Sequence, residues 1–138
     1  MRLEYLTPND WALLRSKSRR LSFQKGDAII QINTRPAALF IVEKGSATVE
    51  VTSGSVIARL TPGDICGEMA FIENNVASAS VLAAESNTEL DAIDFPQVTA
   101  IFNSYPHLEA RFYKSLALLL SQRLRRTSSE LAKSMTKK

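Results

Sequence analysis

Histidine and cysteine, the side chains from which most metal and nucleophilic sites are built, are nearly absent from this sequence. Its 138 residues include one of each, so the chain cannot form an internal disulfide or offer several histidines to one metal ion. The two residues, His107 and Cys66, lie in different parts of the pattern, and no Ser/His/Asp or Cys/His set can be assembled around them. This scarcity argues against an enzyme, and His107 is interpreted as a helix-start residue.

Long apolar runs are missing as well. Runs such as Leu116–Leu120 are far too short to cross a bilayer, and residues 1–5 have no apolar stretch of signal-peptide length. With 45% hydrophobic and 22% charged residues, the composition is that of an ordinary globular chain with one core. We therefore expect a single domain over residues 1–138, without a membrane span, in the cytoplasm, where the lone Cys66 fits a reducing compartment.

The net charge of +3 hides an uneven distribution. Residues 1–122 hold 11 Lys and Arg against 13 Asp and Glu, whereas residues 123–138 hold 6 against 1. The basic end can meet an acidic partner, nucleic acid or a membrane surface, or it can be a solvated helix end whose cations complement the helix dipole. Its cations are Arg123, Arg125, Arg126, Lys133, Lys137 and Lys138.

The middle of the chain, residues 23–93, has the pattern of short strands. Its β-branched runs have all five glycines between or beside them, which is typical of an antiparallel roll, sandwich or barrel. The runs are Ala28–Ile32, Leu39–Glu43, Ala47–Thr52, Val56–Leu60, Ser80–Ala83 and Glu89–Ile93. The expected fold class is mainly β with flanking helices: an antiparallel β-roll or jelly roll with a short N-terminal and a long C-terminal helix.

The flanking helices are expected over residues 6–22 and 94–133, with a basic tail over 134–138. Thr7 is placed to cap the first helix, with Asp10 three residues later, where a carboxylate helps the free amides. Asp94 is placed to cap the helix that follows the roll. A break at Tyr105-Pro106 then separates it from a longer helix over His107–Lys133.

The long helix carries two apolar stripes. In the first stripe, successive residues are four, four and three positions apart, a spacing that suits packing on the roll. We call it the roll-facing stripe: Leu108, Phe112, Leu116 and Leu119. The second has the 3-4 spacing of a coiled-coil seam, and we call it the seam stripe: Ala110, Tyr113, Ala117, Leu120, Leu124, Thr127 and Leu131. Because two stripes need two partners, the pattern predicts a homodimer through this helix.

Three segments together resemble the cyclic nucleotide-binding domain. They begin with Phe23-Gln-Lys-Gly-Asp, Leu39-Phe-Ile-Val-Glu and Pro62-Gly-Asp-Ile-Cys-Gly-Glu-Met-Ala, and the similarity runs from about residue 6 to 131. In that family, the amides at the start of a short helix hold the cyclic phosphate, and a glutamate accepts a hydrogen bond from the ribose 2′-hydroxyl. The resemblance gives these roles to the segment Gly67, Glu68, Met69 and Ala70. Glu68 can also be a structural carboxylate near a helix start.

One departure from the family pattern concerns the phosphate. Ten residues after the glycine the family places an arginine, but this chain has Ala77, followed by Ser78, Ala79 and Ser80. Losing such a charge-assisted partner costs about 2–5 kcal/mol in binding, and the hydroxyls of Ser78 and Ser80 supply no charge. Two other cations can be considered as substitutes, Arg59 and Arg35.

A second resemblance concerns the end of the chain. Gln122-Arg-Leu-Arg-Arg-Thr-Ser-Ser-Glu-Leu is similar to the dimer helix of catabolite-activator-type transcription factors. In those factors a Thr-Ser pair contacts the adenine amino group, one residue coming from the neighbouring subunit, and Thr127 and Ser128 match that pair. Their helix-turn-helix domain has no counterpart in this sequence, so we expect no sequence-specific DNA binding.

These patterns leave three functions open, in decreasing order of weight. The first is a stand-alone regulatory module with weakened or lost cyclic nucleotide affinity, which acts through dimerisation and an unidentified protein partner. The second is a functional cAMP- or cGMP-binding signalling protein with a substitute cation. The third is a cupin-like metal-dependent enzyme, which normally supplies several histidines to one metal. No cofactor is required by the first reading, although cAMP or cGMP is expected to bind weakly.

Overall fold

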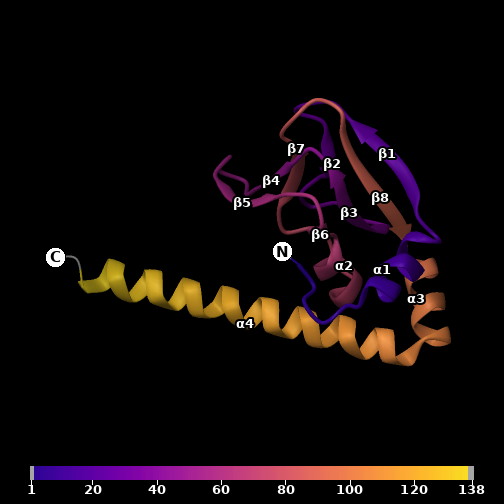
Figure 1. Cartoon of the computed structure of the whole chain (residues 1–138). Helices are drawn as coiled ribbons and strands as arrows, with labels where there is room; N and C mark the ends of the chain where they lie inside the picture. The colour runs from indigo at the N-terminus through magenta and orange to yellow at the C-terminus, as the bar shows by residue number, and fades with distance from the viewer. Residues whose placement is uncertain (1, 137–138) are drawn as a thin grey trace.

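Two four-stranded antiparallel sheets form the body of the protein, and helices cover one side of it (Figure 1). The computed structural model describes residues 2–136. The strands are β1 (Arg19–Phe23), β2 (Ala28–Ile30), β3 (Ala38–Lys44), β4 (Ala47–Glu50), β5 (Val56–Leu60), β6 (Ile65–Cys66), β7 (Ser80–Ala83) and β8 (Thr88–Asp94). The helices are α1 (Pro8–Arg15), α2 (Glu68–Glu73), α3 (Phe95–Ser104) and α4 (Pro106–Thr136). The expected fold class, mainly β with a short N-terminal and a long C-terminal helix, is confirmed.

The two sheets have the strand orders β1-β8-β3-β6 and β2-β7-β4-β5. Strand β3 is buried on both faces because its side chains alternate between two cores. Leu39 and Ile41 join the core beneath the helices, whereas Phe40 and Val42 join the core between the sheets. Two predicted strands, β5 and β7, have the observed bounds, and the other four differ by one or two residues at their ends.

The N-terminal helix is shorter than the expected residues 6–22. The capping box forms as predicted, with the Asp10 amide donating to the Thr7 hydroxyl at 3.1 Å and the Thr7 amide donating to Asp10 at 3.0 Å. The helix nevertheless ends at Arg15, and strand β1 follows and pairs with β8, so the roll begins at residue 19 instead of 23. The residues of β1 alternate between solvent and core, a period that a helix cannot satisfy.

The C-terminal helices break at Tyr105 as expected, but two details differ from the prediction. Asp94 occupies the N-cap position of α3 without a capping hydrogen bond, because its carboxylate accepts from Arg19 of β1 at 3.1 Å. Helix α4 continues through residues 134–136, so most of the expected basic tail is helical. Lys137 and Lys138 lie outside the described residues.

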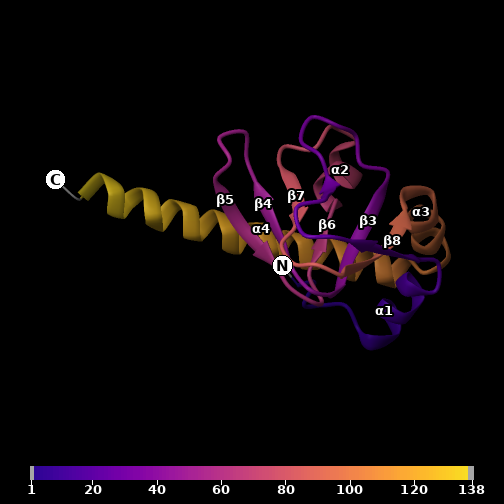
Figure 2. The same ribbon diagram turned by 90° about the horizontal axis from the view of Figure 1, so that it is seen from above.

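Helix α4 runs under the sheets and then projects well beyond them (Figures 1 and 2). Its first half is anchored by the roll-facing stripe, in which Leu108, Phe112 and Leu116 are buried and Leu119 is half-buried. Phe112 packs in an aromatic cluster, 5.0 Å from Phe102 between ring centroids. Every residue of the seam stripe is exposed in the single chain, with Leu124 67% and Leu131 60% accessible.

Candidate functional site

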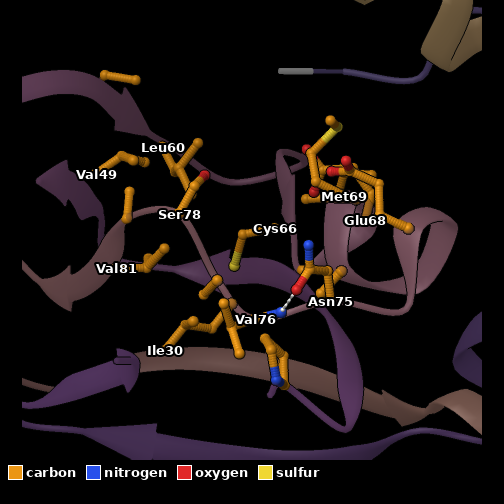
Figure 3. A pocket seen from close by; sticks show the side chains of 18 of the residues that line it. Ile30, Val49, Leu60, Cys66, Glu68, Met69, Asn75, Val76, Ser78 and Val81 are labelled. Atoms are coloured by element: carbon orange, nitrogen blue, oxygen red, sulfur yellow. Dashed lines mark hydrogen bonds between the residues drawn. The ribbon is translucent and has the colours of Figure 1, made fainter. Parts of the chain in front are cut away.

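A cavity of about 330 Å³ opens beside helix α2 and reaches the core between the two sheets. That volume is near the lower end of the range for small-molecule pockets. Apolar side chains from several strands point into it, as Figure 3 shows: Ile30, Val49, Leu60, Cys66 and Val81. Burial raises the pKa of the Cys66 thiol far above its usual range, so this thiol is an inert wall of the cavity.

Gly67 turns the chain from strand β6 into helix α2. Its φ of +90° lies in the left-handed region, and a Cβ at this position would lie 2.7 Å from the carbonyl oxygen of Ala38. Only glycine satisfies both conditions without strain. The turn places the next residues, Glu68, Met69 and Ala70, along one wall of the cavity, as the sequence predicts.

Glu68 is a buried carboxylate in this wall, with 6% of its surface accessible. Burial raises its pKa above the ordinary value of 4.5, and a hydrogen bond from its own backbone and the positive charge of Arg123 partly offset that rise. Figure 3 shows Glu68 beside Met69 at the edge of the cavity. The arrangement offers a ligand a hydrogen-bond acceptor in a largely apolar surrounding.

Arg123 lines the same cavity from helix α4, which sequence analysis did not predict. The residue is half-buried, and its Nη2 is buried without a hydrogen-bond partner among the described residues. The signal was available, because position 123 is four residues beyond Leu119 and therefore continues the roll-facing stripe. The sequence analysis places Arg123 in the basic end of the chain and not in the site.

A further part of the cavity wall is formed by residues 75–79. Ala77 lies in it and packs against the core between the sheets, so the position at which the family places an arginine carries no charge. The Ala77 backbone is held by the preceding loop, since its N–H donates to Thr34 at 2.7 Å and its carbonyl accepts from Asn33 at 2.9 Å. Ser78 is exposed and also lines the cavity, whereas the Asn75 carboxamide oxygen accepts from the Val76 amide at 2.8 Å (Figure 3).

Five of the residues singled out from the sequence do not line the cavity. The Ser80 hydroxyl lies outside it and accepts a hydrogen bond from the Ile32 amide at 3.0 Å. Of the two substitute cations, Arg59 is exposed on β5 and Arg35 donates to the Asn74 carbonyl at 2.8 Å. Thr127 and Ser128 are exposed on the projecting part of α4, so their contact with adenine across a dimer stays a prediction.

Other kinds of site find little support in the described part of the chain. Within residues 2–136, no three His, Cys, Asp or Glu side chains gather as a possible metal site. His107 is the second residue of α4 and is exposed, in keeping with a helix-start role. None of the described helices is long and apolar enough to span a membrane.

Comparisons with known proteins agree with this geometry. Cyclic AMP receptor protein of Thermus thermophilus is 30% identical over 130 residues, covering 91% of this chain and 58% of that protein. Cyclic GMP-binding protein C of Dictyostelium discoideum is 27% identical over 124 residues, covering 87% of this chain and 5% of that protein. The crystal structure of T. thermophilus catabolite activator protein has a TM-score of 0.75 at 30% identity, with 92% of this chain and 59% of that chain covered.

A structure described as a cyclic nucleotide-binding domain from Methylobacillus flagellatus has a TM-score of 0.78 at 20% identity, which shows the shared fold. It covers 94% of this chain and 74% of that one. This chain spans less than two thirds of the curated relatives named above. The profile of the family described as cyclic nucleotide-binding domain matches residues 20–105, from β1 through α3 and around the cavity, and the chain belongs to that family.

Proposed function

We propose that this protein is a regulatory module of the cyclic nucleotide-binding type whose affinity for cAMP and cGMP is weakened. The observation that carries the proposal is Ala77, which lies in the cavity wall where the family places the arginine for the phosphate. Without a guanidinium there, a phosphate loses about 2–5 kcal/mol of charge-assisted hydrogen bonding. A micromolar dissociation constant would then become one above about 100 μM at neutral pH.

A second candidate, a functional cAMP or cGMP sensor with a substitute cation, is favoured by one observation. Arg123 lines the cavity, and one of its nitrogens is buried without a hydrogen-bond partner among the described residues. It reaches the cavity from α4, and its positive charge already acts on a buried carboxylate of the same cavity, Glu68. A phosphate would have to share this cation with Glu68, so the leading proposal remains weakened affinity.

The regulatory output is proposed to pass through the dimer and through contacts with another protein. The exposed seam stripe on α4 supports the homodimer, and a ligand held between the roll and Arg123 would bias the position of that helix. Similar segments occur in longer proteins: the matched part makes up 20% of glutaminase 1 of Bradyrhizobium diazoefficiens and 37% of the Pycsar effector protein BcPycTIR of Burkholderia cepacia. This supports a module that can act together with different kinds of protein. We further propose a cytoplasmic location, no enzymatic activity of this chain and no sequence-specific DNA binding.

Calorimetric titration with cAMP and cGMP tests the proposal. The unmodified protein is expected to bind both with dissociation constants above about 100 μM at neutral pH. The variant Ala77→Arg restores the guanidinium and is expected to bind at least about tenfold more tightly. Thr52→Arg is the matched control, because it adds the same charge at an exposed position outside the cavity lining.

Low-micromolar binding by the unmodified protein would contradict weakened affinity and support the second candidate. The variant Arg123→Gln then decides whether that cation holds the phosphate, with Arg126→Gln as a control for loss of charge on an exposed part of the same helix. An unchanged affinity in Ala77→Arg would show that the missing guanidinium is not what limits binding.

A further inference from the structure

The charges that line the cavity are few and unevenly placed. Glu68 and Glu73 of α2 are the lining carboxylates, and Arg123 of α4 is the lining cation within the described residues. Glu73 is exposed at the end of its helix, whereas Glu68 is buried, so Glu68 is the carboxylate that depends on Arg123 for compensation. When Glu68 is ionised, the cavity therefore holds one buried negative charge and one positive charge.

The two ends of this pair have complementary requirements. The buried Nη2 of Arg123 lacks an acceptor among the described residues, and the Glu68 carboxylate accepts a hydrogen bond from its own backbone N–H. A ligand that offers an acceptor to Arg123 and a donor to Glu68 would satisfy both groups. The remaining walls are mostly apolar, so they favour a flat or aliphatic body over further charge.

We propose that the cavity accommodates a single negative charge, so that an anionic ligand and ionised Glu68 compete for Arg123. While Glu68 is ionised, the preferred ligand is then an uncharged molecule of nucleoside size, which donates to Glu68 and accepts from Arg123. An anion such as cAMP enters with one proton taken up by Glu68. This inference rests on the proposed function, because it assigns the ligand class of the same cavity.

The groups around Glu68 give the direction of the pH dependence. Arg123 lines the same cavity from α4, Glu73 lies further along α2, and the neutral thiol of Cys66 belongs to the adjoining strand β6. Asp64, ahead of β6, is ion-paired with Arg2 at 3.7 Å. Since burial already favours the protonated carboxyl, binding of an anion is strengthened by acid and lost as pH rises above the pKa of Glu68.

The test compares adenosine with cAMP by calorimetry at about pH 5.5 and about pH 8. Adenosine has no charge at either pH, so its affinity is expected to stay constant and to exceed that of cAMP at least about tenfold at the higher pH. The affinity for cAMP is expected to fall by up to about tenfold per pH unit once Glu68 is ionised, as uptake of one proton requires. Glu68→Gln is expected to abolish this slope, whereas Glu73→Gln, which alters the exposed carboxylate, is expected to keep it.

The outcomes separate the two proposals. A low-micromolar cAMP dissociation constant at about pH 8 would contradict the weakened affinity of the proposed function. Weak cAMP binding together with adenosine binding that is equally weak or absent would contradict the proposal that the cavity accommodates a single negative charge. It would leave the proposed function standing. A cAMP affinity that does not change with pH in the unmodified protein would also overturn the competition at Arg123.

Discussion

At the scale of single residues, Gly67 connects the fold to the cavity. The left-handed turn at this position lets α2 start directly after β6, and it brings the backbone against the Ala38 carbonyl in the neighbouring strand. The position of Glu68 in the cavity wall follows from this turn. Gly54, on the β4–β5 hairpin, has a similar φ of +83° but open space where a Cβ would lie.

These two glycines give a matched pair of variants. Gly54→Ala is expected to cost about 1 kcal/mol, because it strains only the left-handed backbone. Gly67→Ala is expected to cost about 2–4 kcal/mol, because the new Cβ also meets a backbone oxygen that cannot move away freely. Urea denaturation of the two variants measures the difference. Equal losses would show that the contact with Ala38 is relieved by a small shift of α2.

The single residues also show how much of the candidate site the sequence predicts. Glu68 and its neighbours were found because a short motif fixes them, and Ala77 was found as a departure from that motif. Arg123 was missed because it stands in a cationic segment, where its charge suggested solvent, although its helical phase places it on the roll side. Its guanidinium lines the same cavity as the buried Glu68, and its positive charge lowers the pKa of that carboxyl.

At the scale of elements, an ion pair fastens α1 to α4. Arg111 donates to both oxygens of the buried Asp10, at 2.6 Å and 2.7 Å. The guanidinium, together with hydrogen bonds from Thr7, lowers the pKa of Asp10 from 3.8 to about 2. The same carboxylate therefore caps α1 and ties it to the long helix.

This pair predicts a loss of stability in acid. Because the pKa of Asp10 is lower in the folded chain than in the unfolded one, its contribution is present above about pH 4 and disappears as pH falls toward about 2. Solvent access to Arg111 reduces that contribution to about 1 kcal/mol. Urea midpoints measured across this range should fall less steeply for Asp10→Asn than for the unmodified protein. Glu4→Gln changes an exposed carboxylate nearby in sequence and should keep the slope.

The elements also show why some boundaries were predictable. Strands β5 and β7 were predicted with their observed bounds because apolar runs end at polar or glycine-rich segments. Strand β1 was mistaken for helix because Arg19 and Arg20 look like a solvated helix end. Its strand conformation depends on distant partners, since Arg20 reaches Asp91 at 2.6 Å and Glu89 at 2.9 Å on β8. A pairing across about 70 residues has no local signal in the sequence.

At the scale of the whole molecule, one helix belongs to two environments. The first half of α4 is built into the core beneath the sheets, and its second half extends beyond them (Figures 1 and 2). Arg123 lies where the two halves meet and reaches the cavity. Any ligand that engages Arg123 therefore acts on the helix at the point where it leaves the domain.

The projecting half predicts a parallel dimer through the seam stripe. Leu120, Leu124 and Leu131 are exposed in the single chain. Because burying a leucine side chain contributes a free energy of about 1.5–3 kcal/mol, pairing of two copies is favoured over leaving both stripes in water. Replacing both Leu120 and Leu124 with glutamate is expected to give a folded monomer in sedimentation experiments at about 100 μM, because charge on the seam removes that gain. The control variant combines Gln122→Glu with Arg126→Glu, which adds negative charge outside the seam stripe, and it should stay dimeric. Phe112→Ala empties a fully buried position and should instead cost about 3–5 kcal/mol of folding stability. A monomeric unmodified protein at that concentration would show that the two-stripe argument for a dimer is wrong.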